Sequence, residues 1–309
     1  MLGAIVGDII GSAYELDNCF SKDAIRPFHD RVFGKCQFTD DSALTMAIAR
    51  TLVENKDVED LETIKTKAAY YLKEYYRRYP STFAGFKARL PKGFTKVSCY
   101  GDTFIEWAES NLEEGESKSY ANGGAMRIAA VGWMYGDIDT TRAVARAITE
   151  ITHKDEAVTA AETLAALIYL ARRQKDKNVL MEYAIDKGYD ISELTEERLE
   201  KIRDINRQKK NESKLLEVYC MPKLTFESAL FAFFYTDNFK ECIRTAISLG
   251  TDSDTIACMA GALAEAYYGD VPMEWQDKAY KKLAECKCLS KDIQRIKDFR
   301  NHVYQLPEQ

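Results

Sequence analysis

The sequence of 309 residues has few of the residues that interrupt helices or that mark a site on their own. Its 6 prolines and 16 glycines leave few points at which a helix must end. The three histidines are widely separated, and the eight cysteines include no CxxC pair. This pattern argues against a zinc site and a disulfide framework, and it indicates the reduced thiols of a cytoplasmic protein.

A long apolar run and a block of basic residues are also missing. The apolar N-terminal stretch MLGAIVGDIIGSAYE is short, contains Asp8 and lacks a basic leader, so we expect neither a signal peptide nor a membrane span. The formal net charge of the chain is -6. We therefore expect neither a membrane nor a nucleic acid as a partner.

The sequence does contain strong helical periodicity. Hydrophobic residues make up 46% and charged residues 30%, a balance typical of a folded globular protein. Apolar residues recur at steps of three and four, and no alternating strand pattern of any length is present. We predict an all-α fold with one core in a single domain over residues 1–309. The highly charged segment 172–216 is predicted to be a helical excursion on the surface. The periodic segments are 41–54, 61–79, 140–153, 155–173 and 254–269.

Two segments begin with the same kind of acidic helix start, FTDDSALTMAIA at 38–49 and GTDSDTIACMAGALAEAYYG at 250–269. Either start alone is explained by N-capping, because Ser, Thr and Asp are the favoured caps. Brought together, however, four carboxylates would repel one another unless some were protonated or a cation lay between them. Hard divalent cations prefer such oxygen ligands, so the doubled motif favours a metal site. The residues concerned are Thr39, Asp40, Asp41, Thr251, Asp252, Asp254 and Thr255.

Other candidate residues have weaker signals. Asp8 lies among Ile and Val, so it should be buried and hydrogen-bonded, with a structural role. Glu15 follows the first apolar helix, where a carboxylate is usually solvated. The turn NGGAMR at 122–127 offers backbone N–H groups at a helix start, which suits a diphosphate. Arg127, the last residue of that turn, is expected at the surface or in a salt bridge. His153, further along the chain, is expected in a plain loop.

Taken together, these stretches resemble the ADP-ribosylglycohydrolase family. The matching pieces are GAIVGDIIGSAYE, FTDDSALTMAIA, NGGAMRIAAVG, ITH and LGTDSDTIACMAGALAEAYYG, in family order from residue 3 to about residue 269. The resemblance implies an all-α fold around a binuclear Mg²⁺ or Mn²⁺ centre. It implies as metal ligands Thr39, Asp40, Asp41, Asp252, Asp254 and Thr255. It implies as substrate-binding residues Asn122, Gly123, Gly124, Met126 and His153, and as catalytic candidates Glu15, Asp41 and Asp254.

The resemblance implies a hydrolase that removes ADP-ribose from a modified protein, with an arginine N-linkage favoured. Alternatives are an O-linkage (to serine or in O-acetyl-ADP-ribose), a non-catalytic ADP-ribose binder, and a di-metal phosphohydrolase. The chain departs from the family pattern at Ala121, where many relatives have glycine, and at Ala13, where many have proline. These departures affect the diphosphate loop and the placement of Glu15. The irregular segment 79–102 matches no sequence that defines a substrate.

Overall fold

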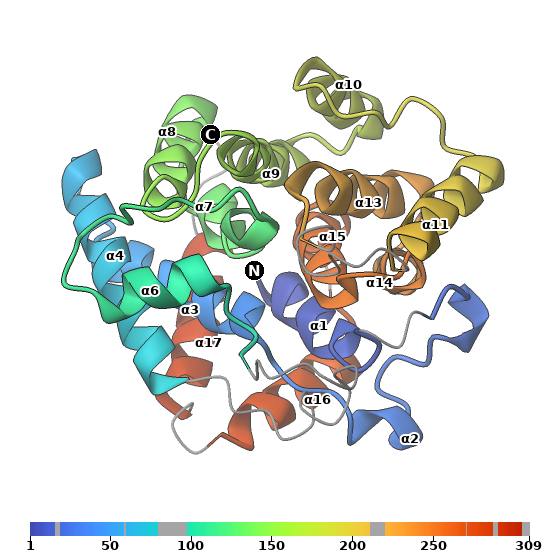
Figure 1. Ribbon diagram of the computed structural model, residues 1–309, viewed down its shortest axis with the longest axis horizontal. Helices are drawn as coiled ribbons and strands as arrows, with labels where there is room; N and C mark the ends of the chain where they lie inside the picture. The colour runs from blue at the N-terminus through green and yellow to red at the C-terminus, as the bar shows by residue number, and fades with distance from the viewer. Residues whose placement is uncertain are drawn as a thin grey trace.

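The computed structural model describes residues 1–15, 19–58, 60–79, 98–210, 220–269, 271–286 and 290–304. These residues form helices and connecting turns, and across this part of the chain β-pairing is limited to one isolated bridge between Ser119 and His153. The prediction of an all-α fold is confirmed (Figure 1). Most of the irregular segment 79–102 lies outside the described residues.

The α-helices vary in length from a single turn to five turns. They are α1 (Leu2–Gly11), α2 (Asp30–Phe33), α3 (Asp40–Glu54), α4 (Leu61–Arg78), α6 (Asp102–Glu109), α7 (Ala129–Met134), α8 (Ile138–Thr149), α9 (Glu156–Arg173), α10 (Lys177–Asp186), α11 (Glu196–Lys210), α13 (Pro222–Tyr235), α14 (Phe239–Ser248), α15 (Ser253–Tyr268), α16 (Met273–Ala284) and α17 (Ser290–Tyr304). Two short 3-10 helices, η1 (Lys22–Ala24) and η2 (Asn122–Gly124), lie between them. Among the described helices, none is long and apolar enough to cross a membrane.

Helix α15 lies at the centre of the molecule and packs against α1, α9, α13 and α14 (Figure 1). Nearly all of its residues are buried, and many are Ala or Gly. Small side chains allow neighbouring helices to approach on every side, which explains how one helix can have so many partners. Gly269 ends the helix in the left-handed conformation, with φ of 79°.

The tightest packing in the core joins α1 to α15. A Cβ atom built on Gly3 would lie 2.2 Å from the Gly261 carbonyl oxygen, and one on Gly7 would lie 2.0 Å from that of Ala257. On Gly11 it would lie 2.5 Å from the Cα atom of Asp254. Because these glycines are four residues apart, they share one face of α1, and that face rests directly on the α15 backbone. The N-terminal turn of α15 is therefore held against the C-terminal turn of α1.

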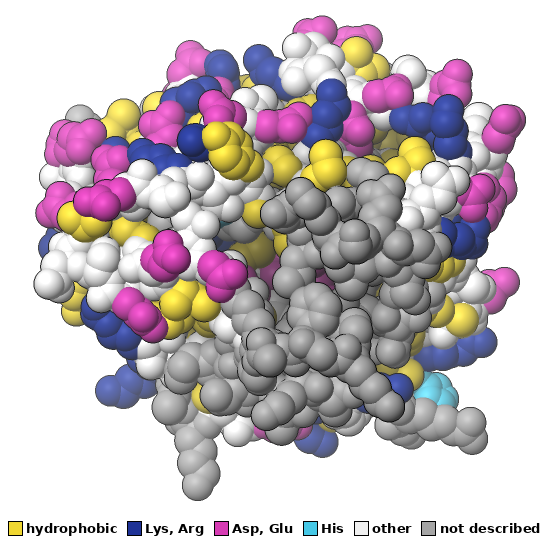
Figure 2. Space-filling view, viewed as in Figure 1, with side chains coloured by type: hydrophobic (Ala, Val, Ile, Leu, Met, Phe, Trp, Pro, Cys, Tyr) yellow, Lys and Arg dark blue, Asp and Glu magenta, His cyan; other side chains and the backbone are white. Residues whose placement is uncertain are grey.

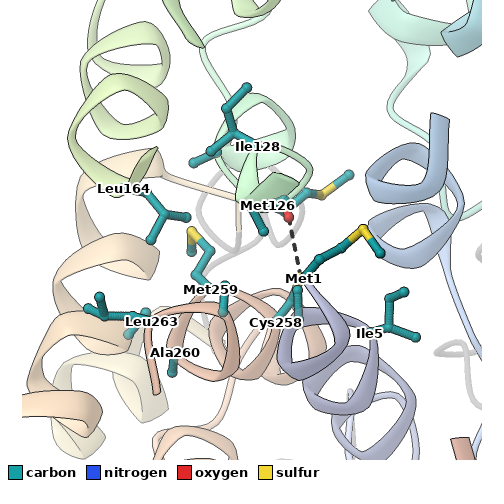
Figure 3. Packing of buried hydrophobic residues seen from close by; sticks show 14 of the residues in the cluster. Met1, Ile5, Met126, Ile128, Leu164, Cys258, Met259, Ala260 and Leu263 are labelled. Atoms are coloured by element: carbon teal, nitrogen blue, oxygen red, sulfur yellow. Dashed lines mark hydrogen bonds between the residues drawn. The ribbon is translucent and has the colours of Figure 1, made fainter. Parts of the chain in front are cut away.

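Apolar side chains surround this helix pair and extend the core towards α7 and α9 (Figure 3). Met126 and Cys258 lie side by side there, and the Cys258 thiol donates to the Met126 carbonyl oxygen over 3.3 Å. The Met126 side chain is buried among its apolar neighbours. The stretch that follows the glycine turn is thus anchored directly to the central helix.

The described part of the charged segment 172–216 contains α10 and α11. Most charged side chains of α11 are exposed or half-buried, but Arg203 and Asn206 are buried. The charge pattern of the sequence did not predict these two buried positions. They have a specific place in the site, described below.

We expect the substitution Gly7→Ala to lower the free energy of unfolding by about 3 kcal/mol or more, since the new methyl group meets backbone that cannot rotate away. Urea unfolding monitored by circular dichroism measures this change. Gly101→Ala is the matched control, because a Cβ atom at Gly101 has no neighbour within 4 Å. Equal midpoints for wild type and Gly7→Ala would show that α1 and α15 are not packed this closely.

Candidate metal centre

Two groups of carboxylates meet where α1, α3 and α15 converge. One ligand oxygen each from Asp8, Asp41 and Asp254 lie within 4.8 Å of one another. The same is true of Glu15, Asp252 and Asp254, so Asp254 belongs to both groups. Figure 2 shows a hollow near the middle of this face with acidic side chains inside it. The structure therefore brings the acids of the two Thr-Asp motifs together and adds two acids from the first helix and its end.

Asp8 joins the start of α3 to α1. Its carboxylate accepts hydrogen bonds from the backbone N–H groups of Thr39, at 3.0 Å, and Ser42, at 3.1 Å. The hydroxyls of the same two residues also donate to it. Asp8 is thus hydrogen-bonded as the sequence indicates. Its place beside Asp41 and Asp254 was not predicted, because burial of an Asp gives no information about which distant carboxylates surround it.

The hydrogen bonds around Asp41 leave its carboxylate short of positive partners. The Thr39 hydroxyl lies 2.8 Å from Asp8 Oδ1 and 3.1 Å from Asp41 Oδ2, but it has a single proton to donate. Asp41 Oδ2 also accepts from the Thr255 hydroxyl at 3.3 Å. Asp41 Oδ1 is buried and has no hydrogen-bond partner among the described residues. A proton or a cation at this point would give Asp41 Oδ1 a partner and would reduce the repulsion between the carboxylates of Asp41 and Asp8.

The pKa values of the cluster are raised because burial and neighbouring negative charges disfavour the ionised form. Burial raises the pKa of Asp8 to about 6. The pKa of Asp40 rises to about 8, through burial first and then the charges of Asp8 and Asp252. Burial and neighbouring acids also raise the pKa values of Asp41 and Asp254 well above the usual range. Asp40 is half-buried and belongs to neither group of three.

The donor set fits hard divalent cations. Every donor is a carboxylate or hydroxyl oxygen, the type of ligand that such ions prefer. A cation would give the unpartnered oxygen of Asp41 a ligand contact, and it would balance the charge of the Asp254 carboxylate that both groups share. Asp252 stands at the N-cap of α15 but makes no capping hydrogen bond with its side chain. N-capping therefore explains Thr39, whose side chain caps α3, but it does not explain Asp252.

Helix α11 holds the turn that delivers Asp252 and Asp254. Arg203 donates to the Ser248 carbonyl oxygen at 3.1 Å and to the Ser248 hydroxyl at 2.7 Å. Asn206 Nδ2 donates to the Leu249 carbonyl oxygen at 2.8 Å. The next two residues have left-handed backbones, with φ of 78° at Gly250 and 56° at Thr251. This conformation is unfavourable for a β-branched residue, so the turn requires outside support.

The glycine turn at 122–124 forms η2 and is tied to the acidic cluster. Asn122 Nδ2 donates to Asp252 Oδ2 at 2.7 Å, and Asn122 N–H donates to the Cys220 carbonyl oxygen at 3.0 Å. The N–H group of Met126 donates to the Asn122 carbonyl oxygen, and its side chain is in the core. The Met126 carbonyl oxygen accepts from Thr45 and Cys258. Its backbone groups are thus engaged within the protein.

His153 and Arg127 lie behind the glycine turn. A Cβ atom on Gly123 would lie 3.2 Å from His153 Nε2, so the ring faces the turn. His153 is buried rather than in an open loop. The expectation of a surface or salt-bridged Arg127 is wrong: its side chain is fully buried and forms no ion pair with any described residue. The apolar residues on both sides of Arg127 in the sequence were the available signal of burial.

A polar hollow of about 390 Å³ opens beside His153. Three basic side chains line it, together with two acidic ones and the first turns of α9. Its lining residues are Lys118, Arg146, Glu150, His153, Lys154, Asp155, Val158 and Thr159. The excess of basic groups makes this hollow suitable for an anionic part of a ligand.

Comparison with known proteins places this geometry in context. The family model described as ADP-ribosylglycohydrolase matches residues 1–306. The human protein named ADP-ribosylhydrolase ARH3 is 27% identical, over 96% of this chain and 92% of its own length. The protein named ADP-ribosylarginine hydrolase Tri1 from Pseudomonas putida (strain GB-1) is 26% identical, over 90% of this chain and 72% of its own length.

A solved structure entitled ADP-ribosylglycohydrolase-related protein complex has a similar fold. It superposes with a TM-score of 0.57 and 20% sequence identity, covering 91% of this chain and 94% of that one. At this identity the similarity supports the fold alone.

The raised carboxyl pKa values predict how stability depends on pH. Between the unfolded pKa, about 4, and the folded values of Asp8 and Asp40, about 6 and 8, the folded state binds more protons than the unfolded state. Their contribution to stability is therefore complete below about pH 4 and is lost as the pH rises to about 8. In EDTA, we expect the melting temperature of wild type to fall more than that of Asp41→Asn between about pH 6 and about pH 8. We also expect Mn²⁺ to raise the melting temperature of wild type more at about pH 8 than at about pH 6.

Thermal unfolding at several pH values measures these differences. Asp186→Asn is the control, because Asp186 is exposed at the end of α10. Identical pH dependence in wild type and Asp41→Asn would contradict the assignment of raised pKa values to this cluster.

We expect Arg203→Ala to lower the free energy of unfolding by about 2–4 kcal/mol, because it leaves buried acceptors without donors. It should also weaken Mn²⁺ binding, since the turn before Asp252 loses its support. Calorimetric unfolding and Mn²⁺ titration measure the two effects. The control is Lys201→Ala, an exposed position on the same helix. Wild-type Mn²⁺ affinity in Arg203→Ala would mean that α11 does not position the acidic turn.

Proposed function

The chain belongs to the ADP-ribosylglycohydrolase family, and we propose that it hydrolyses the bond between ADP-ribose and an arginine side chain of a modified protein. The observation that carries the proposal is the carboxylate of Asp254, shared by two acidic groups beside the glycine turn. The arginine linkage is supported by the relative named ADP-ribosylarginine hydrolase, which aligns with 90% of the chain.

We place the ADP-ribose across the link between the glycine turn and the acids. Its diphosphate would bind at Asn122, Gly123 and Gly124, with His153 as a further donor. The N–H groups of the two glycines would donate to it, because first-turn N–H groups have no acceptor within their own helix, whereas the N–H group of Asn122 donates to the Cys220 carbonyl oxygen. The hydrogen bond from Asn122 to Asp252 keeps this turn next to the carboxylates. The ribose that carries the scissile bond would then lie over the acids.

The acids would hold two divalent cations, Mg²⁺ or Mn²⁺. When bound, such ions supply Lewis acidity that orients ribose hydroxyls and lowers the pKa of water. The residues that would hold them are Thr39, Asp40, Asp41, Asp252, Asp254 and Thr255, and the two groups of three add Asp8 and Glu15. The mixture of carboxylates and hydroxyls supports oxygen-binding ions rather than zinc.

The carboxylates also have a direct part in the reaction. Positive charge develops at the anomeric carbon as the glycosidic bond breaks, and the side chains of Asp41 and Asp254 would stabilise it. Of the three catalytic candidates, Asp41 and Asp254 are buried and Glu15 is half-buried, so among these three Glu15 is the one that a water molecule from solvent can reach. We propose Glu15 as the general base that takes a proton from this water.

An O-linked substrate (ADP-ribosylated serine or O-acetyl-ADP-ribose) is the second candidate. It is compatible with the relatives named ADP-ribosylhydrolase ARH3, because that name, unlike the name of the arginine hydrolase, specifies no linkage; the human member aligns with 96% of the chain. Non-catalytic binding is disfavoured because binding alone gives no reason to bury mutually repelling acids. Phosphohydrolase activity is disfavoured because the family to which the chain belongs is one of glycohydrolases. The seven described cysteines are free thiols, which supports the proposed cytoplasmic location.

One assay tests the proposal. The purified protein is incubated with arginine-linked and serine-linked ADP-ribosyl peptides, in EDTA, Mg²⁺ or Mn²⁺, and released ADP-ribose is measured. We expect release from the arginine peptide only with a divalent cation, and a loss of about 100-fold or more in Asp254→Asn. Asp186→Asn is the control. Faster release from the serine peptide would overturn the linkage, and full activity of Asp254→Asn would overturn the site.

A further inference from the structure

We propose that Arg127 and Thr152 act as positioning residues that fix the tautomer of His153, so that its ring presents an uncharged Nε2–H donor to the diphosphate of the ligand. The identity of the ligand rests on the proposed function, whereas the tautomer is a property of the free protein. The inference starts from the side chains of Arg127, Thr152 and His153, which form one hydrogen-bonded row behind the glycine turn.

The direction of the first hydrogen bond is set by chemistry. Arg127 Nη2 lies 2.8 Å from the Thr152 hydroxyl oxygen. A guanidinium group has donors and no acceptor, so Arg127 must donate and Thr152 must accept. The guanidinium is fully buried, and its Nε and Nη1 atoms have no partner among the described residues, so it is a permanent and enclosed positive charge.

The second hydrogen bond then has one favourable direction. The Thr152 hydroxyl oxygen lies 2.8 Å from His153 Nδ1. The hydroxyl of Thr152 makes no other side-chain hydrogen bond in the described part of the chain, so its own proton is satisfied only by donation to Nδ1. If Nδ1 carried a proton, the buried hydroxyl proton would remain without an acceptor. Nδ1 therefore accepts, and the ring proton lies on Nε2.

The surroundings keep the ring neutral and in place. Burial lowers the pKa of His153 well below 6.5, and the nearby positive charge of Arg127 lowers it further. Cβ atoms built on Gly123 and Gly124 would lie 3.2 Å from Nε2 and 3.3 Å from Cγ of this ring. The glycines thus leave just enough room for the ring edge, and Nε2 faces the turn proposed to bind the diphosphate.

The bridge between Ser119 and His153 fixes the backbone around this row. Ser119 N–H donates to the Thr152 carbonyl oxygen at 2.9 Å, and Lys154 N–H donates to the Ser119 carbonyl oxygen at 3.1 Å. The charged groups near the ring are Arg127, linked to it through Thr152, and Lys118, Arg146, Glu150, Lys154 and Asp155 around the hollow. These supply charge at longer range, while His153 supplies a directed donor whose charge does not change near neutral pH.

Nuclear magnetic resonance of protein labelled with nitrogen-15 histidine measures the tautomer directly. The chain has three histidines, so the His153 signals can be assigned by their loss in His153→Gln. In the free, Mg²⁺-loaded wild type we expect a protonated Nε2 and an unprotonated Nδ1, unchanged between about pH 6 and about pH 8. A protonated Nδ1 at about pH 7 would overturn the inference.

Variants of Thr152 connect the tautomer to binding. Thr152→Val removes the hydroxyl at nearly constant shape, and we expect a mixed or reversed tautomer and an affinity for ADP-ribose about tenfold weaker by calorimetry. Thr152→Ser should restore both properties. The control is Thr51→Val, which removes an equally buried hydroxyl that bonds to its own helix at Ala47. A wild-type tautomer and affinity in Thr152→Val would overturn the inference.

The two readouts separate this inference from the proposed function. Failure of wild type to bind ADP-ribose would contradict the proposed function, whatever tautomer is found. Normal binding of ADP-ribose by a wild type with the opposite tautomer would contradict the inference and leave the proposed function intact.

Discussion

The structure depends on the close packing of α1 against α15, because this contact forces like charges together. Three glycines of α1 rest on the α15 backbone, which sets Asp8 and Glu15 beside Asp254. Carboxylates that repel one another would separate if the helices could slide or tilt. The absence of side chains at the contact removes that freedom, so the shape of the apolar core maintains an arrangement that electrostatics alone would oppose.

The cluster therefore links folding to the occupancy of the site. Without positive charge, several acids must take up protons, and their raised pKa values show this tendency. The surrounding hydrogen bonds are arranged to hold the acids in place and not to neutralise them. Thr39 caps α3 and contacts two carboxylates, and Asn122 connects Asp252 to the glycine turn. Local strain at Thr251 is tolerated because α11 supports the turn from outside.

Much of the fold and part of the site could be predicted from the sequence, since both have local signals. Helical periodicity predicted the all-α architecture, and repetition of the Thr-Asp pattern indicated that Asp41 and Asp254 would meet. Asp8, Arg127 and Arg203 could not be placed in the same way. Their surroundings come from segments distant in the chain, and a single charged residue in a sequence does not reveal whether it is buried or which groups face it.

The glycine face of α1 also limits where this protein can change over evolution or by design. Any added side chain on that face would displace the backbone that carries Asp254, so the inner wall of the site has almost no tolerance for variation. The α1–α15 contact places no such restriction on the residues that line the polar hollow beside His153, such as Lys118 and Lys154. New ligand preferences would therefore arise by exchange of side chains around that hollow, while the helical pair stays unchanged.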